Sequence, residues 1–149
     1  MKPLKTLAAT LLICLLGLSA RAAEPAAALG LWTTEGGKSR VEIFDCSGKL
    51  CGKIVWLKEL LDNQGKEKVD RENPDEALKG RKILGLALLS DFVAEGQSGR
   101  QWTDGRIYNP EDGQTYKCNM ELQDDGKLKV RGYVGLPLFG KTQIWTPAK

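Results

Sequence analysis

The sequence contains no histidine in its 149 residues. This absence excludes catalytic sets in which histidine activates a serine or cysteine, histidine metal ligands, and the usual proton carrier near neutral pH. The sequence also lacks a Walker-type glycine-rich loop and a sustained amphipathic helix. Because no nucleophile and base can be recognised, an enzyme is the least favoured class, and we predict no cofactor. Catalysis of glycoside hydrolysis by a pair of carboxylates is not excluded, since the separation of the two groups depends on the fold.

Beyond its first 22 residues, the chain also lacks a formal net charge. The formal net charge is +3, from 22 Lys and Arg against 19 Asp and Glu. The whole excess comes from Lys2, Lys5 and Arg21, and no acidic residue precedes Glu24. Residues 23–149 therefore carry 19 basic and 19 acidic groups. A neutral body lacks the clustered positive charge that nucleic-acid binding requires, so we predict no nucleic-acid partner.

The first residues have the pattern of a signal peptide. Two lysines precede the apolar run Leu7–Leu18, which is short for a membrane span, and the Ala-Arg-Ala segment 20–22 offers small residues for cleavage. We predict a cleaved signal peptide over residues 1–22 and a flexible lead-in over residues 23–29. A retained N-terminal anchor is the alternative. The mature protein is expected to be periplasmic or secreted, with no membrane span after processing.

Short segments of alternating apolar and polar residues fill the rest of the chain. In one of them, Tyr116, Cys118, Met120 and Leu122 share a face that we expect to point inward. Turn residues separate the segments, as in hairpins. Strands are expected at Gly30–Thr34, Ser39–Asp45, Leu50–Lys58, Ile83–Val93, Gln101–Tyr108, Gln114–Leu122, Leu128–Val134 and Phe139–Thr146. They predict one all-β domain over residues 30–147, an antiparallel up-and-down β-barrel of about eight strands or a related sandwich.

Three cysteines follow the predicted signal peptide. Cys46 and Cys51 flank a predicted hairpin turn, and facing positions on antiparallel strands lie about 5 Å apart at Cα, which suits a disulfide. Outside the cytoplasm such a pair should oxidise, adding about 2 kcal/mol for so short a loop. A redox-active pair is less favoured, because the spacing is not Cys-x-x-Cys. Cys118 is expected to be a buried, inert thiol, since a nucleophile would lack an activating histidine.

The segment Glu59–Lys82 interrupts the strands with turn residues. So long an irregular connection is usually a lid, a binding loop or a disordered insert. Asp75 is expected to cap a single helical turn. Asp70, Asn73 and Asp75 offer oxygens for calcium, but their spacing lacks the EF-hand pattern. We expect Asp70 and Asn73 to bond the backbone of their own loop instead, and we predict no metal site.

Aromatic residues on the expected strands suggest either a core or a ligand cavity. The four tryptophans are Trp32, Trp56, Trp102 and Trp145. The tripeptide Gly30-Leu31-Trp32 resembles the G-x-W signature that opens lipocalin-like barrels. This resemblance implies a basic residue on a late strand that packs across Trp32, and Arg131 is the candidate.

A second resemblance covers nearly the whole chain after the signal peptide. Its motifs are Gly30-x-Trp32, Cys46-x-Gly48-x-Leu50-Cys51-Gly52-x-Ile54-x-Trp56, Asp70-x-x-Asn73-Pro74, Leu84-Gly85, Trp102-x-x-Gly105-x-Ile107-Tyr108-x-Pro110-x-x-Gly113-x-x-Tyr116, Leu128-x-Val130-Arg131-Gly132 and Trp145. The pattern is similar to an uncharacterised exported bacterial family, domain of unknown function 2147. The resemblance implies a lipocalin-like barrel in the bacterial envelope and supplies no catalytic residues.

Two functions fit such a barrel. We expect an exported lipocalin-like protein that binds a small apolar or amphipathic ligand inside the barrel. The side chains expected to bind it are Trp32 as the floor, Trp56, Tyr108, Tyr116, Met120 and Arg131. The alternative is a ligand-free envelope module that contacts a protein partner, or maintains the envelope, through the loop over residues 59–82. A hollow interior would favour the ligand, and a filled interior would favour the module.

Overall fold

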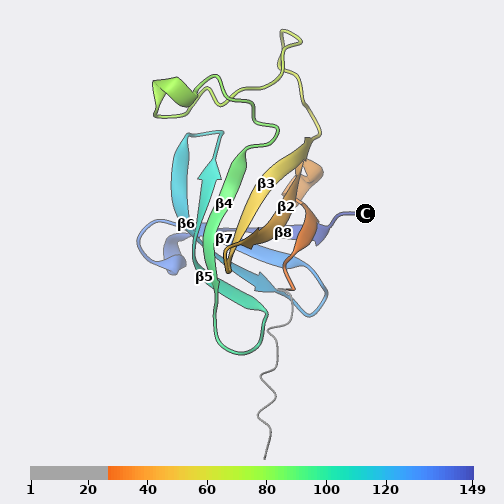
Figure 1. Cartoon of the computed structure of the whole chain (residues 1–149), viewed down its shortest axis with the longest axis vertical. Coiled ribbons are helices and arrows are strands. Elements are labelled where there is room, and N and C mark those ends of the chain that lie inside the picture. The colour runs from red at the N-terminus through yellow and green to blue at the C-terminus, as the bar shows by residue number, and fades with distance from the viewer. Residues whose placement is uncertain (1–26) are drawn as a thin grey trace, which may run out of the picture.

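The computed structural model describes residues 27–149, so the predicted signal peptide lies outside the described residues. Eight strands run in sequence order around a closed antiparallel barrel (Figure 1). They are β1 (Gly30–Thr33), β2 (Ser39–Cys46), β3 (Lys49–Leu57), β4 (Ala87–Ala94), β5 (Gln101–Asn109), β6 (Gln114–Leu122), β7 (Leu128–Tyr133) and β8 (Lys141–Pro147). The predicted all-β, up-and-down barrel is confirmed.

The barrel closes where β1 meets β8. Trp32 pairs with Pro147, and Thr33 pairs with Thr146. Closure matters because an open meander would leave a row of unpaired backbone groups on each edge strand. The short first strand therefore completes the sheet rather than merely leading into it.

Two predicted strands begin later than expected. The apolar run Ile83–Val93 is a strand only from Ala87, because Gly85 takes a φ of 90° and turns the chain before β4. The last strand begins at Lys141 rather than at Phe139, because Pro137–Phe139 form a short 3-10 turn, η3, with the proline at its first position.

The hairpin between β2 and β3 carries the predicted disulfide. Ser47 and Gly48 form its two-residue turn with φ of 55° and 90°, the conformation that matches the twist of paired strands. The disulfide joins Cys46 to Cys51 across a Cα–Cα distance of 5.8 Å. The two cysteines are diagonal rather than directly facing neighbours, since Cys46 pairs in register with Lys49.

The long connection from Glu59 to Leu86 forms a cap beyond one end of the barrel, drawn in yellow and green in Figure 1. We call these residues the cap. It contains one short 3-10 turn, η2 (Glu76–Leu78), whose first turn is capped as predicted, because the Asp75 carboxylate accepts from the Ala77 backbone N–H. Backbone bridges between Leu61 and Glu67 and between Val69 and Lys82 brace it. Among residues 27–149, no helix has the length and apolar content needed to cross a membrane.

Candidate functional site

The interior of the barrel is filled by side chains from its own strands. Val41, Phe92 and Leu128 are 0 % exposed, Trp145 is 1 % exposed and Trp102 is 2 % exposed. A chamber wide enough for water would leave accessible surface on the side chains that line it. These side chains therefore form a close-packed core.

Small residues on the barrel wall make room for this core. A Cβ atom added at Gly105 would collide with the ring of Phe92, and one added at Gly52 would lie 2.8 Å from Leu89 Cδ1. Gly105 pairs in register with Cys118 on β6, which is another small and fully buried residue. The Phe92 ring thus occupies space that a binding barrel would leave for a ligand.

The residues predicted to line a cavity do not come together. Trp32 and Met120 are buried in the core, where the Trp32 indole N–H donates to the carbonyl of Ala28 at 2.8 Å. Trp56 lies on the outside and is 40 % exposed. Tyr116, only partly buried, donates its hydroxyl to the exposed carboxylate of Asp112 at 2.7 Å.

Arg131 does not make the contact with Trp32 that the lipocalin resemblance implied. Its neighbour Val130 is buried, so the alternation of the strand directs Arg131 outward. Its Nε donates to the Pro137 carbonyl at 2.6 Å and its Nη2 to the Leu138 carbonyl at 3.2 Å, while Nη1 donates to Thr142 Oγ1 at 2.6 Å. The predicted packing partner is wrong, and Arg131 fastens the β7–β8 connection instead.

The described residues do contain one buried polar cluster, at the junction of the cap and the barrel. The Asp70 carboxylate is 0 % exposed. One of its oxygens accepts from the Tyr108 hydroxyl of β5 at 2.6 Å. The other accepts from Asn73 Nδ2 and Arg81 Nε, each at 2.8 Å. We call these four residues the Asp70 cluster, and it ties both arms of the cap to the barrel wall.

Charge and hydrogen bonding act in opposite directions at Asp70. Burial alone would raise the pKa of its carboxyl, but the hydrogen bonds from Tyr108, Asn73 and Arg81, with the charge of Arg81, hold the pKa below its usual value. For Tyr108, burial and the hydrogen bond to the Asp70 anion raise the pKa of the hydroxyl. At neutral pH the cluster is therefore a carboxylate paired with a guanidinium and a neutral phenol.

This arrangement corrects the sequence interpretation of the cap motif. Asn73 does accept from the backbone N–H of Asp75, as expected of an Asx turn. Asp70, however, directs its carboxylate at side chains rather than at the backbone of its loop. Every bond to that carboxylate comes from an N–H or O–H donor and one donor is a cation, so the cluster suits holding the cap and leaves no vacant oxygen pair for a metal ion.

Backbone contact reinforces the same junction. Gly113, in the β5–β6 turn, has a φ of 71°, and a Cβ atom there would collide with the carbonyl oxygen of Glu72 in the cap. The two motifs that contain Asp70 and Gly113 thus meet in space. The sequence alone does not reveal this, because two strands, β4 and β5, lie between Asp70 and Gly113 in the chain.

Cys118 is buried, as expected, and its thiol is in an environment that disfavours reaction. Burial raises the pKa of its thiol to about 12, so the nucleophilic thiolate is scarce at neutral pH. No group of three or more His, Cys, Asp or Glu side chains suited to a metal ion occurs within residues 27–149. Two depressions on the surface, of about 380 Å³ and 240 Å³, are lined by none of the six residues predicted to bind a ligand.

Comparison with known proteins assigns the family. A model of bacterial proteins described as "Uncharacterized protein conserved in bacteria (DUF2147)" matches residues 30–147. The chain belongs to this family. A similar solved structure is HP1028 from the human pathogen Helicobacter pylori, described as belonging to the lipocalin family. The two chains are 28 % identical with a TM-score of 0.68, over 81 % of this chain and 82 % of that one. No curated protein matches the DUF2147 chain.

Proposed function

We propose that this DUF2147 protein is an exported envelope module that acts through its outer surface rather than by holding a ligand in its barrel. The filled interior carries this proposal, because Phe92 and the tryptophans occupy the volume that a lipocalin-like container would keep open. The Cys46–Cys51 disulfide supports export, since such bonds persist in oxidising compartments. The absence of histidine from the sequence, together with the quiet Cys118 thiol, supports a role without catalysis.

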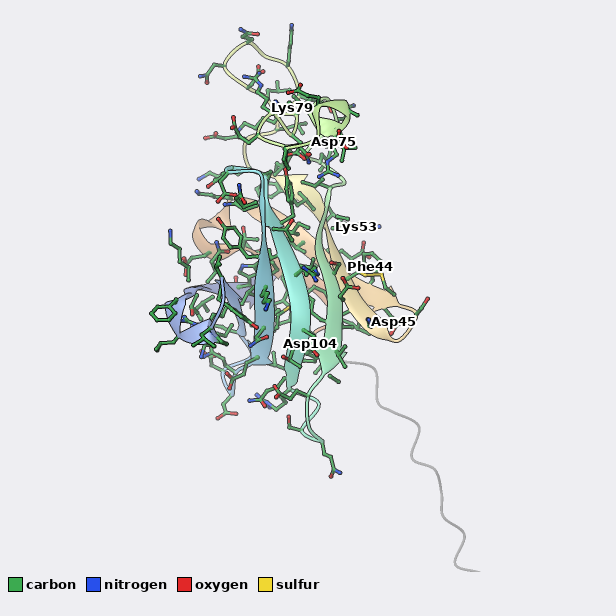
Figure 2. All side chains as sticks on the ribbon, turned by 90° about the vertical axis from the view of Figure 1, so that its left-hand side faces the viewer. Phe44, Asp45, Lys53, Asp75, Lys79 and Asp104 are labelled. Atoms are coloured by element: carbon green, nitrogen blue, oxygen red, sulfur yellow. A yellow bond between two sulfur atoms is a disulfide. The ribbon has the colours of Figure 1, made fainter. Side chains whose placement is uncertain are left out.

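The cap is the surface that we assign to a protein partner. The Asp70 cluster holds it in place, so binding would not have to order a loose segment. Its outer side carries exposed ion pairs, among them Lys79 with Glu76 at 2.6 Å, and the half-exposed apolar side chains Leu61 and Leu78. Figure 2 shows Asp75 and Lys79 at the outer end of the molecule. A mainly polar surface with a few apolar contacts suits a partner that binds reversibly.

Likeness to the lipocalin-family structure favours a second candidate, a small apolar ligand inside the barrel. Uptake of benzene or xenon separates the two. We expect the wild-type protein to take up neither, and Phe92→Ala to take up both, because an engineered apolar cavity binds such probes. Phe92→Leu provides a milder variant in case Phe92→Ala does not fold. Stoichiometric uptake by the wild-type protein would support the ligand-binding candidate and contradict ours.

Site-specific photocrosslinking tests the assigned surface. A photoreactive residue at Leu61 or Leu78 should give one discrete adduct in the cell envelope. The matched control is Val55, an apolar residue on the barrel wall that is 36 % exposed, against 38 % for Leu78. Adducts from Val55 but none from the cap would refute the cap as the interface.

A further inference from the structure

The connection between β7 and β8 exposes several large apolar side chains, and the function proposed above gives them no role. Val134 is 71 % exposed, Leu136 63 %, Leu138 79 % and Phe139 75 %. We call residues 134–139 the apolar loop. Single exposed apolar residues are ordinary, but four within six residues concentrate apolar surface in one short segment, as is typical of interaction sites.

The shape of the apolar loop is fixed by polar contacts of the backbone. Arg131 donates to two of its carbonyls, at Pro137 and Leu138. Within the loop, the Phe139 N–H donates to the Leu136 carbonyl at 3.1 Å. In Figure 1 the turn containing η3 projects sideways from the barrel wall. The apolar side chains are therefore held outward on a projecting, ordered tip.

Positive charge lies beside this tip. Arg106, Lys117 and Tyr133 line an outer depression of about 240 Å³, together with Gly105 and one acidic residue, Asp104. Lys117 pairs in register with both Arg106 and Tyr133, and Tyr133 directly precedes the apolar loop. Neither Arg106 nor Lys117 forms an ion pair with any described residue. Among the residues that line the depression, two cations accompany one carboxylate, so its lining is net positive, although residues 23–149 as a whole are formally neutral.

We propose that the apolar loop inserts into the surface of a bilayer that contains anionic phospholipid, with Arg106 and Lys117 against the headgroup phosphates. An apolar tip beside basic side chains is the combination that binds anionic membrane surfaces. A second copy of the chain is less suitable, because a two-fold interface needs a broad self-complementary face rather than a projecting tip. This proposal goes beyond the proposed protein partner of the cap and does not require it.

Vesicle co-sedimentation of the exported, processed protein tests the proposal. We expect binding to phosphatidylcholine vesicles that contain phosphatidylglycerol, and much weaker binding to phosphatidylcholine alone or at high salt. Leu138→Ser with Phe139→Ser should weaken binding about tenfold or more, from lost apolar burial. Arg106→Gln or Lys117→Gln should each weaken it about fivefold.

Matched variants separate this site from general effects. Leu61→Ser with Leu78→Ser in the cap, and Lys49→Gln at the β2–β3 turn, should leave vesicle binding unchanged. Far-ultraviolet circular dichroism should be unchanged in every variant, since the altered side chains are exposed. Failure to bind anionic vesicles at low salt, or equal binding by the Leu138→Ser, Phe139→Ser protein, would overturn the proposal. A lipid-free dimer that this double variant abolishes would instead identify a second copy as the occupant and would also overturn it.

Discussion

The cap and the apolar loop connect neighbouring strands at the same end of the barrel, yet their side chains are arranged in opposite ways. The cap turns a carboxylate inward, against Tyr108 and Arg81, and shows charged pairs to solvent. The backbone of the apolar loop accepts hydrogen bonds from the guanidinium of Arg131 in β7, while its leucine and phenylalanine side chains are exposed to solvent. The first arrangement holds the cap to the barrel by its side chains, and the second holds the apolar side chains of the loop away from the barrel.

Among substitutions that distinguish the cap from the apolar loop, the largest loss of unfolding free energy should come from the close contact at Gly113. Gly113→Ala forces both a strained φ and a collision with the Glu72 carbonyl, so we expect it to cost about 3 kcal/mol of unfolding free energy and to release the cap. Gly126→Ala is the matched control, because Gly126 has a φ of 80° with nothing within 4 Å of its Cβ position. Its cost should be about 1 kcal/mol. Equal losses in urea denaturation would show that the cap does not press on Gly113.

Removal of the carboxylate should release the cap at somewhat lower cost. Asp70→Ala leaves buried donors of Asn73 and Tyr108 without their acceptor, and we expect a loss of about 1–3 kcal/mol. Hydrogen exchange should accelerate in the cap and much less in the barrel strands. Asp125→Ala, in the exposed β6–β7 turn, is the control and should change cap exchange little. Uniform acceleration over the whole chain would contradict a local role for Asp70.

Acid should act on the cap through the same carboxyl. The folded pKa of Asp70 lies below the ordinary value of 3.8, so the ionised group stabilises the docked cap fully above that value. This contribution is lost as the pH falls through the folded pKa. We expect limited proteolysis of the cap to begin only below about pH 3.8 in the wild-type protein. Asp70→Asn should remove this acid-dependent step, and an unaltered acid profile would exclude Asp70 as its origin.

A smaller effect is expected at the apolar loop. Arg131→Ala removes three hydrogen bonds, but most of them lie at an exposed position, so we expect a loss of about 1 kcal/mol. Arg131→Lys should restore only part of it, because a single ammonium group does not reproduce the planar guanidinium. Exchange should quicken between Leu136 and Gly140 and stay unchanged in the cap. Coupled changes in both segments would show that they are not independent.

The smallest effect should come from the exposed side chains themselves. Leu138→Ser with Phe139→Ser is expected to change the unfolding free energy by about 0.5 kcal/mol or less. Phe92→Ala provides the contrast, because removal of a fully buried ring typically costs about 3–5 kcal/mol. A large loss in the loop variant would mean that these side chains support the fold rather than a surface contact.

Alternation along the strands predicts an antiparallel barrel or a related sandwich, since a period of two residues reports directly which side of a sheet is buried. The pairing of β1 with β8 makes it a closed barrel. The disulfide can also be predicted from the sequence, because its two cysteines flank one turn. The sequence does not reveal the filled interior, because the filling depends on a strand register that places Gly105 beside the ring of Phe92. The Asp70 cluster was also missed. Its partner Tyr108 lies 38 residues away in sequence, and the two meet only because the cap folds over the end of β5.

The apolar loop illustrates a different failure of sequence interpretation. The sequence predicts that the last strand begins at about Phe139, but the 3-10 turn that begins at Pro137 delays the strand until Lys141. Exposure of Leu136, Leu138 and Phe139 is a property of the turn and not of the residue types.

Hydrogen–deuterium exchange, measured with and without phosphatidylglycerol-containing vesicles, tests most directly that the barrel is solid and that the apolar loop makes the proposed membrane contact. The account predicts that vesicles slow exchange between Tyr133 and Lys141 and leave the cap and the interior strands unchanged. Slowed exchange throughout the barrel strands, as expected for a lipid drawn inside, would contradict it, and so would an apolar loop whose exchange the vesicles do not alter.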